Sequence, residues 1–210
     1  ALANQDLNRS DFTMAFSRIG KLKQERQATL DLTIDTRWLM LGASLLMEKK
    51  DEGYLDAAVE WLGPLFESDN DLARLLVAQW LMLAQPEQVD KLRQYVVQRG
   101  GEPSADMINW LFAANGKDLA DTVNALKARL QEPSADPLNH LFLSVANYNQ
   151  GSRQPALNAL REFSPYLKQT SYWVDIDRNP ESVWIRSSAV RSINTAGIDL
   201  KRKLDLAATR

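Results

Sequence analysis

A segment of eleven residues occurs twice in this chain, thirty residues apart. Residues 102–112 read EPSADMINWLF and residues 132–142 read EPSADPLNHLF, so eight of the eleven positions are identical. Shorter matches extend the pattern, because NALK at 124–127 is followed by NALR at 158–161 and WLML occurs at both 38–41 and 80–83. Self-similarity with a period of about 30–35 residues indicates a repeat protein, in which each unit buries its apolar face against its neighbours.

Each repeat reads as a pair of helices. Apolar residues return every three or four positions along most of the chain, which is the spacing of amphipathic helices. Short polar residues that can cap a helix, and Gly or Pro residues that end one, divide the chain into segments. The pattern predicts helices over residues 12–22, 35–50, 55–62, 69–84, 86–99, 104–115, 118–130, 134–151 and 155–164, the last one stopped by Ser164-Pro165.

We therefore predict an all-α fold, a right-handed α-α superhelix of about four to five helical hairpins with a C-terminal capping helix. The expected organisation is an N-terminal helix in residues 1–34, the repeats in 35–165, and a loop with a capping or docking helix in 166–210. Gly197 marks a point at which that last helix can divide. The capping helix is expected to cover the open face of the last repeat.

These repeats resemble the tetratricopeptide-like superfamily of helical hairpins. In the last repeat the family spacing is matched, with Ser144 in the place of a small glycine, by Leu143, Ser144, Gly151, Ala156 and Leu160. In the first repeat Trp38, Leu41, Gly42 and Leu45 fit the pattern, and the middle repeats match it only in helix placement. The resemblance covers residues 35–165 and implies a fold that binds proteins or peptides.

The same resemblance implies that peptides bind along the concave face, which the first helix of each hairpin lines. Carried over, it points to Asn109, Asn139 and Asn147 as exposed amides. Asn109 and Asn139 share one repeat position, so a ladder of amides can hydrogen-bond an extended backbone. The alternative is that the two asparagines are duplicated only because the repeat was duplicated.

Composition excludes several chemistries. The chain has one His and no Cys, which rules out disulfides, thiol nucleophiles, iron–sulfur clusters and any centre that needs two imidazoles. His140 occupies the repeat position of Trp110, so we interpret it as a packing residue. Residues 175–177 begin like a calcium loop, but Pro180 and Arg186 stand where that loop needs Gly and Glu. We expect no catalytic, cofactor-binding or metal-binding residues.

The charge pattern bears on the partner. The net charge is −2, with ten basic and eighteen acidic residues in 31–136 and net positive charge at both ends. This balance argues against nucleic acid as the partner, and no apolar run approaches the ~18 residues of a membrane span. The acidic repeats either form a groove that attracts a basic peptide or are simply solvated helix faces.

Aromatic residues outside the repeats are the candidates for direct partner contact. Four tryptophans lie at repeat positions expected in the core, namely Trp38, Trp61, Trp80 and Trp110. Tyr172, Trp173 and Trp184 have no such place, and together with Arg186 they are residue types enriched at binding hot spots. The C-terminal segment is therefore predicted to carry the specific interaction, unless its capping function buries Trp184.

These observations favour a non-enzymatic protein–protein interaction scaffold or assembly subunit, of a bacterial envelope complex. A small-x-small start at Ala1-Leu2-Ala3 and the lack of Cys favour a periplasmic or secreted location, with a cytoplasmic one as the alternative. Two other functions remain open: an envelope carbohydrate-active hydrolase on a helical scaffold, and the repeat module of a larger protein. A deep pocket with two facing carboxylates and an exposed Trp would favour the hydrolase.

Overall fold

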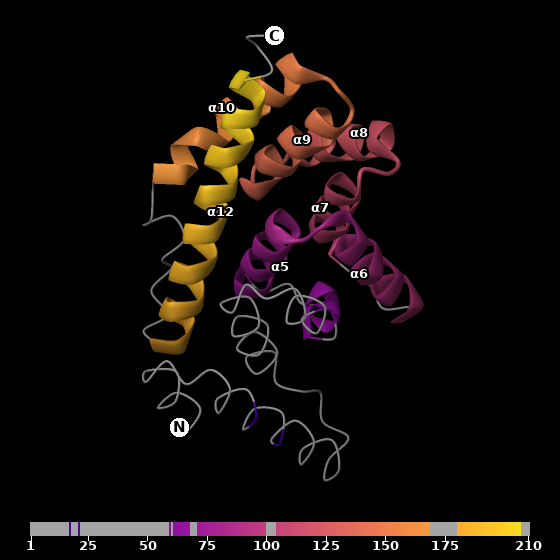
Figure 1. Ribbon diagram of the computed structural model, residues 1–210, viewed down its shortest axis with the longest axis vertical. Helices are drawn as coiled ribbons and strands as arrows, with labels where there is room; N and C mark the ends of the chain where they lie inside the picture. Colours follow the sequence, from indigo (N-terminus) through magenta and orange to yellow (C-terminus); the bar gives the residue numbers. More distant parts are fainter. Residues whose placement is uncertain are drawn as a thin grey trace.

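The computed structural model describes residues 61–67, 71–99, 104–168 and 180–206, and the isolated positions Ser17, Lys21 and Val59. The regular structure of this part of the chain is entirely helical, which confirms the all-α prediction (Figure 1). In chain order its elements are the 3₁₀ turn η1 (Gly63–Glu67), α5 (Asp71–Leu83), α6 (Pro86–Arg99), α7 (Ala105–Asn115), α8 (Leu119–Arg129), α9 (Leu138–Asn149), α10 (Arg153–Lys168) and α12 (Pro180–Leu206).

Helices α7 to α10 form two stacked hairpins, α7–α8 and α9–α10. The first hairpin turns at Gly116, whose left-handed φ of 74° suits a residue without a Cβ and whose N–H donates to the Phe112 carbonyl at 3.1 Å. The helix end predicted at this glycine is confirmed. In the second hairpin, Ser144 Oγ donates to the Ala156 carbonyl at 2.8 Å and both residues are buried. Two small side chains thus let α9 and α10 approach closely.

Helices α5 and α6 were expected to form a hairpin, but they do not pack along each other. Helix α6 lies against α7 and η1, and α5 lies against η1, α7 and α12. The turn η1 fills the space between α5 and α6 with the buried side chains of Leu65 and Phe66. Gly63 accommodates the Tyr95 ring of α6, which would overlap a Cβ at this position. The insertion of η1 explains why the hairpin is open.

Two predicted helix boundaries are wrong, and each of them lies at a proline. Helix α9 begins at Leu138 rather than at Ser134, since the residue before Pro137 is biased away from the helical conformation. Pro137 is the N-cap, and Asp136 just before it accepts the Leu138 N–H through Oδ1 at 2.9 Å. Helix α10 continues through Pro165 to Lys168. Phe163 and Tyr166, which flank that proline in the sequence, stack on each other with ring centroids 6.1 Å apart.

The core runs through the hairpin interfaces. Trp61, Trp80 and Trp110 are buried, as predicted for packing tryptophans, whereas Trp38 lies outside the described residues. Trp110 of α7 stacks on Phe142 of α9 with ring centroids 5.2 Å apart and planes 13° from parallel. Aromatic residues at different positions of successive repeats thus pack against each other across the interface.

Helix α12 is a single 27-residue helix that runs along the side of the molecule away from α8 (Figure 1). It is continuous through Gly197, so it does not divide there. It contacts α10, as a cap would, but it contacts α5 more extensively and also reaches α9. Gln79 of α5 donates through Nε2 to Ser192 Oγ at 3.0 Å. The apolar stripe of α12 buried against these helices comprises Ala189, Val190, Ile193, Leu200 and Leu204.

Candidate binding groove between α10 and α12

The described part of the chain contains a buried ionic cluster. Asp106, at the start of α7, is only 2% exposed, and it accepts two hydrogen bonds from Arg129 of α8, from Nε at 2.8 Å and from Nη2 at 3.3 Å. Asn139 of α9 donates to the same carboxylate at 3.3 Å. The hydrogen bond to Asp106 is the main cause that raises the pKa of Arg129 above its ordinary value. This carboxylate therefore joins three helices.

A second carboxylate faces the same cluster. Asp136 holds the repeat position of Asp106, and Arg74 of α5 lies 3.5 Å from its Oδ2 and 3.8 Å from Asp106 Oδ2. Burial raises the pKa of Asp136, while the Leu138 N–H and Arg74 oppose that change. Both carboxylates are enclosed and contact arginines. We therefore interpret the pair as a structural contact between helices, and not as the acid and base of a catalytic cleft.

The asparagines of the expected amide ladder are not arranged as a ladder. Asn139 is completely buried, and its Oδ1 accepts the Trp110 indole N–H at 2.7 Å. Asn147 is also buried and donates to the Leu143 carbonyl at 2.8 Å. The expectation that these two residues are exposed is therefore wrong, because both amides satisfy partners inside the fold. Asn109 is half-buried, and its part in binding stays a prediction.

The remaining candidates lie partly outside the structure described. Tyr172 and Trp173 fall outside the described residues, as does the calcium-like segment 175–177. Trp184 and Arg186 belong to α12, but the side chains of that helix are described only from Ala189 onward. His140 is half-buried, and burial lowers its pKa while the nearby Glu162 carboxylate opposes the change. Contact with a partner therefore stays a prediction for Tyr172, Trp173, Trp184 and Arg186.

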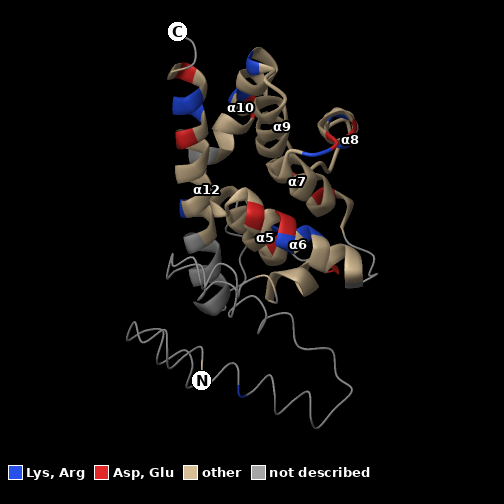
Figure 2. Cartoon of the chain, turned by 45° about the vertical axis from the view of Figure 1, so that its right-hand side comes forward, with Lys and Arg blue, Asp and Glu red and all other residues tan. Residues whose placement is uncertain are grey.

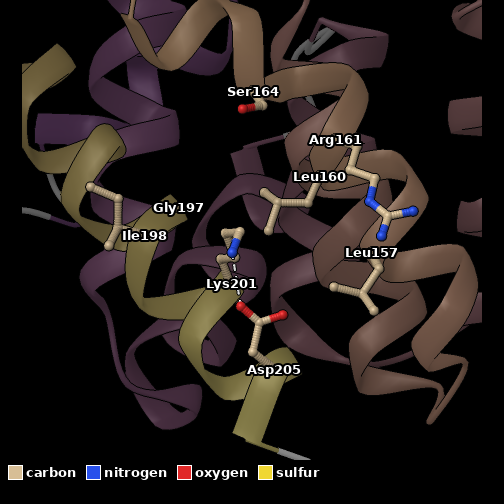
Figure 3. A pocket seen from close by; sticks show the side chains of 8 residues that line it. All are labelled: Leu157, Leu160, Arg161, Ser164, Gly197, Ile198, Lys201 and Asp205. Carbon is tan, nitrogen blue, oxygen red and sulfur yellow. Dashed lines mark hydrogen bonds and ion pairs between the residues drawn. The ribbon is translucent and has the colours of Figure 1, made fainter. Parts of the chain in front are cut away.

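A groove lies along the contact between α10 and the C-terminal half of α12 (Figure 3). It has a volume of about 140 Å³. Its lining comes from one edge of each helix: Leu157, Leu160, Arg161 and Ser164 from α10, and Gly197, Ile198, Lys201 and Asp205 from α12. Within each helix these residues recur at spacings of three and four, so each set forms one stripe. We call this feature the α10–α12 groove.

The floor of the α10–α12 groove is apolar and its rim is charged. Ile198 is 58% exposed although it is a large aliphatic residue. Lys201 Nζ donates to Asp205 Oδ2 at 2.8 Å across one turn of α12, and Arg161 stands on the opposite rim. Nearby at the end of α12, Leu206 is 62% exposed. Figure 2 shows basic and acidic residues alternating along this end of the helix.

The groove was not predicted from the sequence. The C-terminal segment was predicted to carry the interaction, but on the strength of its aromatic residues and not of Ile198 or Arg161. A useful signal does exist, since Ile198 lies one position beyond Gly197 on the edge of the apolar stripe of α12. The spacing along α12 cannot show that Ile198 lines a groove, because the other side of the groove is formed by α10.

Among the residues that the structure describes, no group of three His, Asp or Glu side chains is placed to hold a metal ion. None of the helices described has both the length and the apolar character needed to cross a bilayer.

No protein-family model matches this chain, and no curated protein or solved structure matches it either. The class of protein is therefore defined by the fold alone, an all-helical arrangement compatible with a helical-repeat superfamily.

Proposed function

We propose that this protein is a non-enzymatic protein-interaction module, a scaffold or assembly subunit whose partner docks in the α10–α12 groove. The observation that supports the proposal is Ile198, a large aliphatic side chain that is 58% exposed at the edge of a groove. Exposed apolar side chains beside a concavity with a polar rim are typical of protein-binding sites.

The size of the groove favours a protein partner over a metabolite. Pockets for drug-sized ligands occupy about 300–1,000 Å³, whereas this groove has about 140 Å³. A cavity of about 150 Å³ accommodates a benzene ring. The groove therefore suits one apolar side chain of a peptide or protein, with the rest of the partner lying on the surrounding helices.

The position of α12 disfavours the surface expected from the family resemblance. In each hairpin the first helix would line the concave face, and α12 lies on two of these first helices, α5 and α9. The surface that α12 covers is occupied by the chain itself, so the outer edge of α12 replaces the amide ladder in this proposal. The envelope complex and the periplasmic or secreted location stay predictions.

The proposal is tested by placing a photo-crosslinking amino acid at Ile198 in the full chain and identifying the captured partner in the cells that make the protein. Val97 of α6 is a matched control, because it is also aliphatic and is 68% exposed. The partner is then purified, and its affinity is measured for the parent protein, Ile198→Glu and Val97→Glu. Circular dichroism verifies that each variant keeps its helical fold.

We expect Ile198→Glu to lower the affinity at least tenfold, since a carboxylate would replace an apolar side chain buried in the complex. Val97→Glu should change it little. If crosslinks form equally at both positions, or if both variants bind the partner like the parent protein, the groove is not the docking site and the proposal fails.

A further inference from the structure

The shape of the α10–α12 groove limits what can lie in it. Its lining runs from Leu157 to Ser164 on α10 and from Gly197 to Asp205 on α12, which is about two helical turns, or about 10 Å, on each side. Figure 3 shows Ser164 at the same end as Gly197, and Leu157 at the same end as Asp205, so the two helices run antiparallel. A short segment lying between two such edges presents one large side chain to the floor.

The charges around the groove are unequal. Lys201 is paired with Asp205, which neutralises that rim within the helix. Arg161 is exposed and hydrogen-bonds only to the amide oxygen of Asn158 at 3.5 Å, and no carboxylate in the described part of the chain pairs with it. Lys203, two residues after Lys201, is exposed as well but does not line the groove. Among the charged residues that line the groove, Arg161 and Lys201 are basic and Asp205 is acidic, so the positive charge of Arg161 is not balanced within the lining.

We propose that the α10–α12 groove recognises a peptide segment in which one large apolar side chain is flanked by Asp or Glu. The apolar side chain lies against Leu157, Leu160 and Ile198, and the flanking carboxylate pairs with Arg161. This inference rests on the proposed function and specifies its partner. It follows from charge complementarity, which supplies specificity and speeds association at protein interfaces.

An anionic membrane surface has the same charge as such a peptide, but the groove fits it less well. Asp205 lines the groove itself, and Asp199 lies six residues before it in α12 and 3.9 Å from Arg202. A flat anionic surface would approach these carboxylates together with the lysines. A peptide can place its own carboxylate at the Arg161 end alone.

The test uses two fluorescein-labelled peptides of helix-forming residues, identical except for their charges. Each has a single Leu on one face, flanked by Glu in the first peptide and by Lys in the second. Their affinities for the full chain are measured by fluorescence anisotropy at about 0.05 M and about 0.5 M salt. The proteins compared are the parent, Ile198→Ala, Arg161→Glu and Lys203→Glu. The last is the matched control, because it makes the same charge change close to the groove without lining it.

We expect the Glu peptide to bind the parent protein about fivefold more tightly than the Lys peptide at low salt, and the difference to shrink at high salt. Arg161→Glu should remove or reverse the preference, while Lys203→Glu should keep most of it. Ile198→Ala should weaken both peptides. Sedimentation with vesicles of phosphatidylcholine and phosphatidylglycerol should show no binding that depends on Arg161.

The possible failures are distinguishable. Equal affinity for both peptides, with both weakened by Ile198→Ala, would overturn the charge preference but leave the proposed function in place. A preference unchanged by Arg161→Glu, or binding of neither peptide, would also overturn this inference, and the crosslinking at Ile198 would then decide the proposed function by itself. Arg161-dependent binding to the vesicles would assign the surface to a membrane instead.

Discussion

The indole N–H of Trp110 donates to Asn139 Oδ1 over 2.7 Å, and both side chains are completely buried between α7 and α9. The other atom of the same amide, Nδ2, donates to Asp106. One asparagine therefore satisfies two buried polar groups that belong to the preceding repeat. This explains why Asn139 is part of the fold, although its repeat equivalent Asn109 is only half-buried.

Asn139→Ala should destabilise the protein far more than Asn109→Ala. The first change leaves the Trp110 N–H without an acceptor and removes a donor to Asp106, which should cost about 3 kcal/mol of unfolding free energy. The second should cost about 0.5 kcal/mol or less. Urea unfolding followed by circular dichroism measures both. Equal losses would mean that the buried hydrogen bonds do not hold this interface.

Trp110→Phe and Trp80→Phe form a second matched pair. Both tryptophans are completely buried at equivalent repeat positions, but Trp80 Nε1 has no hydrogen-bond partner among the residues that the structure describes. Each change removes a similar volume, and only Trp110→Phe also removes a hydrogen bond. We expect Trp110→Phe to be the more destabilising by about 1 kcal/mol. Thermal and urea unfolding of both variants would show this, and a greater loss for Trp80→Phe would contradict it.

Asp106→Asn should destabilise the stack by removing the charge that faces Arg129 and Arg74. Loss of one partner of a buried ion pair costs about 3–5 kcal/mol. Here we expect about 2 kcal/mol, because the Arg129 side chain is 35% exposed and keeps a contact with Glu132 at 2.7 Å. Asp90→Asn is the control. Asp90 pairs with Lys117 at 2.9 Å on the surface, so its replacement should change little. Denaturant unfolding of the two variants should show this order.

The buried Asp136 should make stability depend on pH in an unusual direction. Because its pKa is raised above the ordinary value of 3.8, the folded state holds the proton more tightly than the unfolded state does. Its contribution is fully present below pH 3.8 and is lost as the pH rises through the folded pKa. The free energy of unfolding of the parent minus that of Asp136→Asn should therefore fall as the pH increases from about 4 to about 7. A difference that rises over this range would contradict the assignment.

The sequence predicted the described helices well where the signals are local. The helix-ending turn at Gly116 follows from the need for a left-handed backbone, and the burial of Trp80 and Trp110 follows from helical spacing and repetition. The wrong start at Ser134 is also a local matter, because Pro137 biases the residue before it away from the helical conformation. The stop predicted at Pro165 is wrong because a proline only removes one hydrogen bond from a helix that other contacts can still stabilise.

Contacts between distant segments were not predictable in this way. Nothing in the repeat pattern indicates that η1 separates α5 from α6, or that α12 contacts α5. For the candidate site, sequence reasoning assigned the interaction to the C-terminal segment but could not name Ile198 or Arg161, because the groove exists only where α10 and α12 meet. Asn139 was misplaced since a repeated polar residue looks the same in sequence whether it faces water or a buried indole.

The contact of α12 with α5 also bears on how the protein unfolds. Arrays whose units touch only their neighbours lose structure piecemeal from an end. Here Gln79 and Ser192, separated by 113 positions, are hydrogen-bonded, so the last helix of the array is fastened to the first one described. Closing so long a loop delays folding. Because α5 and α12 bury each other, unfolding of either helix exposes the apolar face of the other. The helices from α5 to α12 should therefore unfold together as one cooperative unit and not one after another.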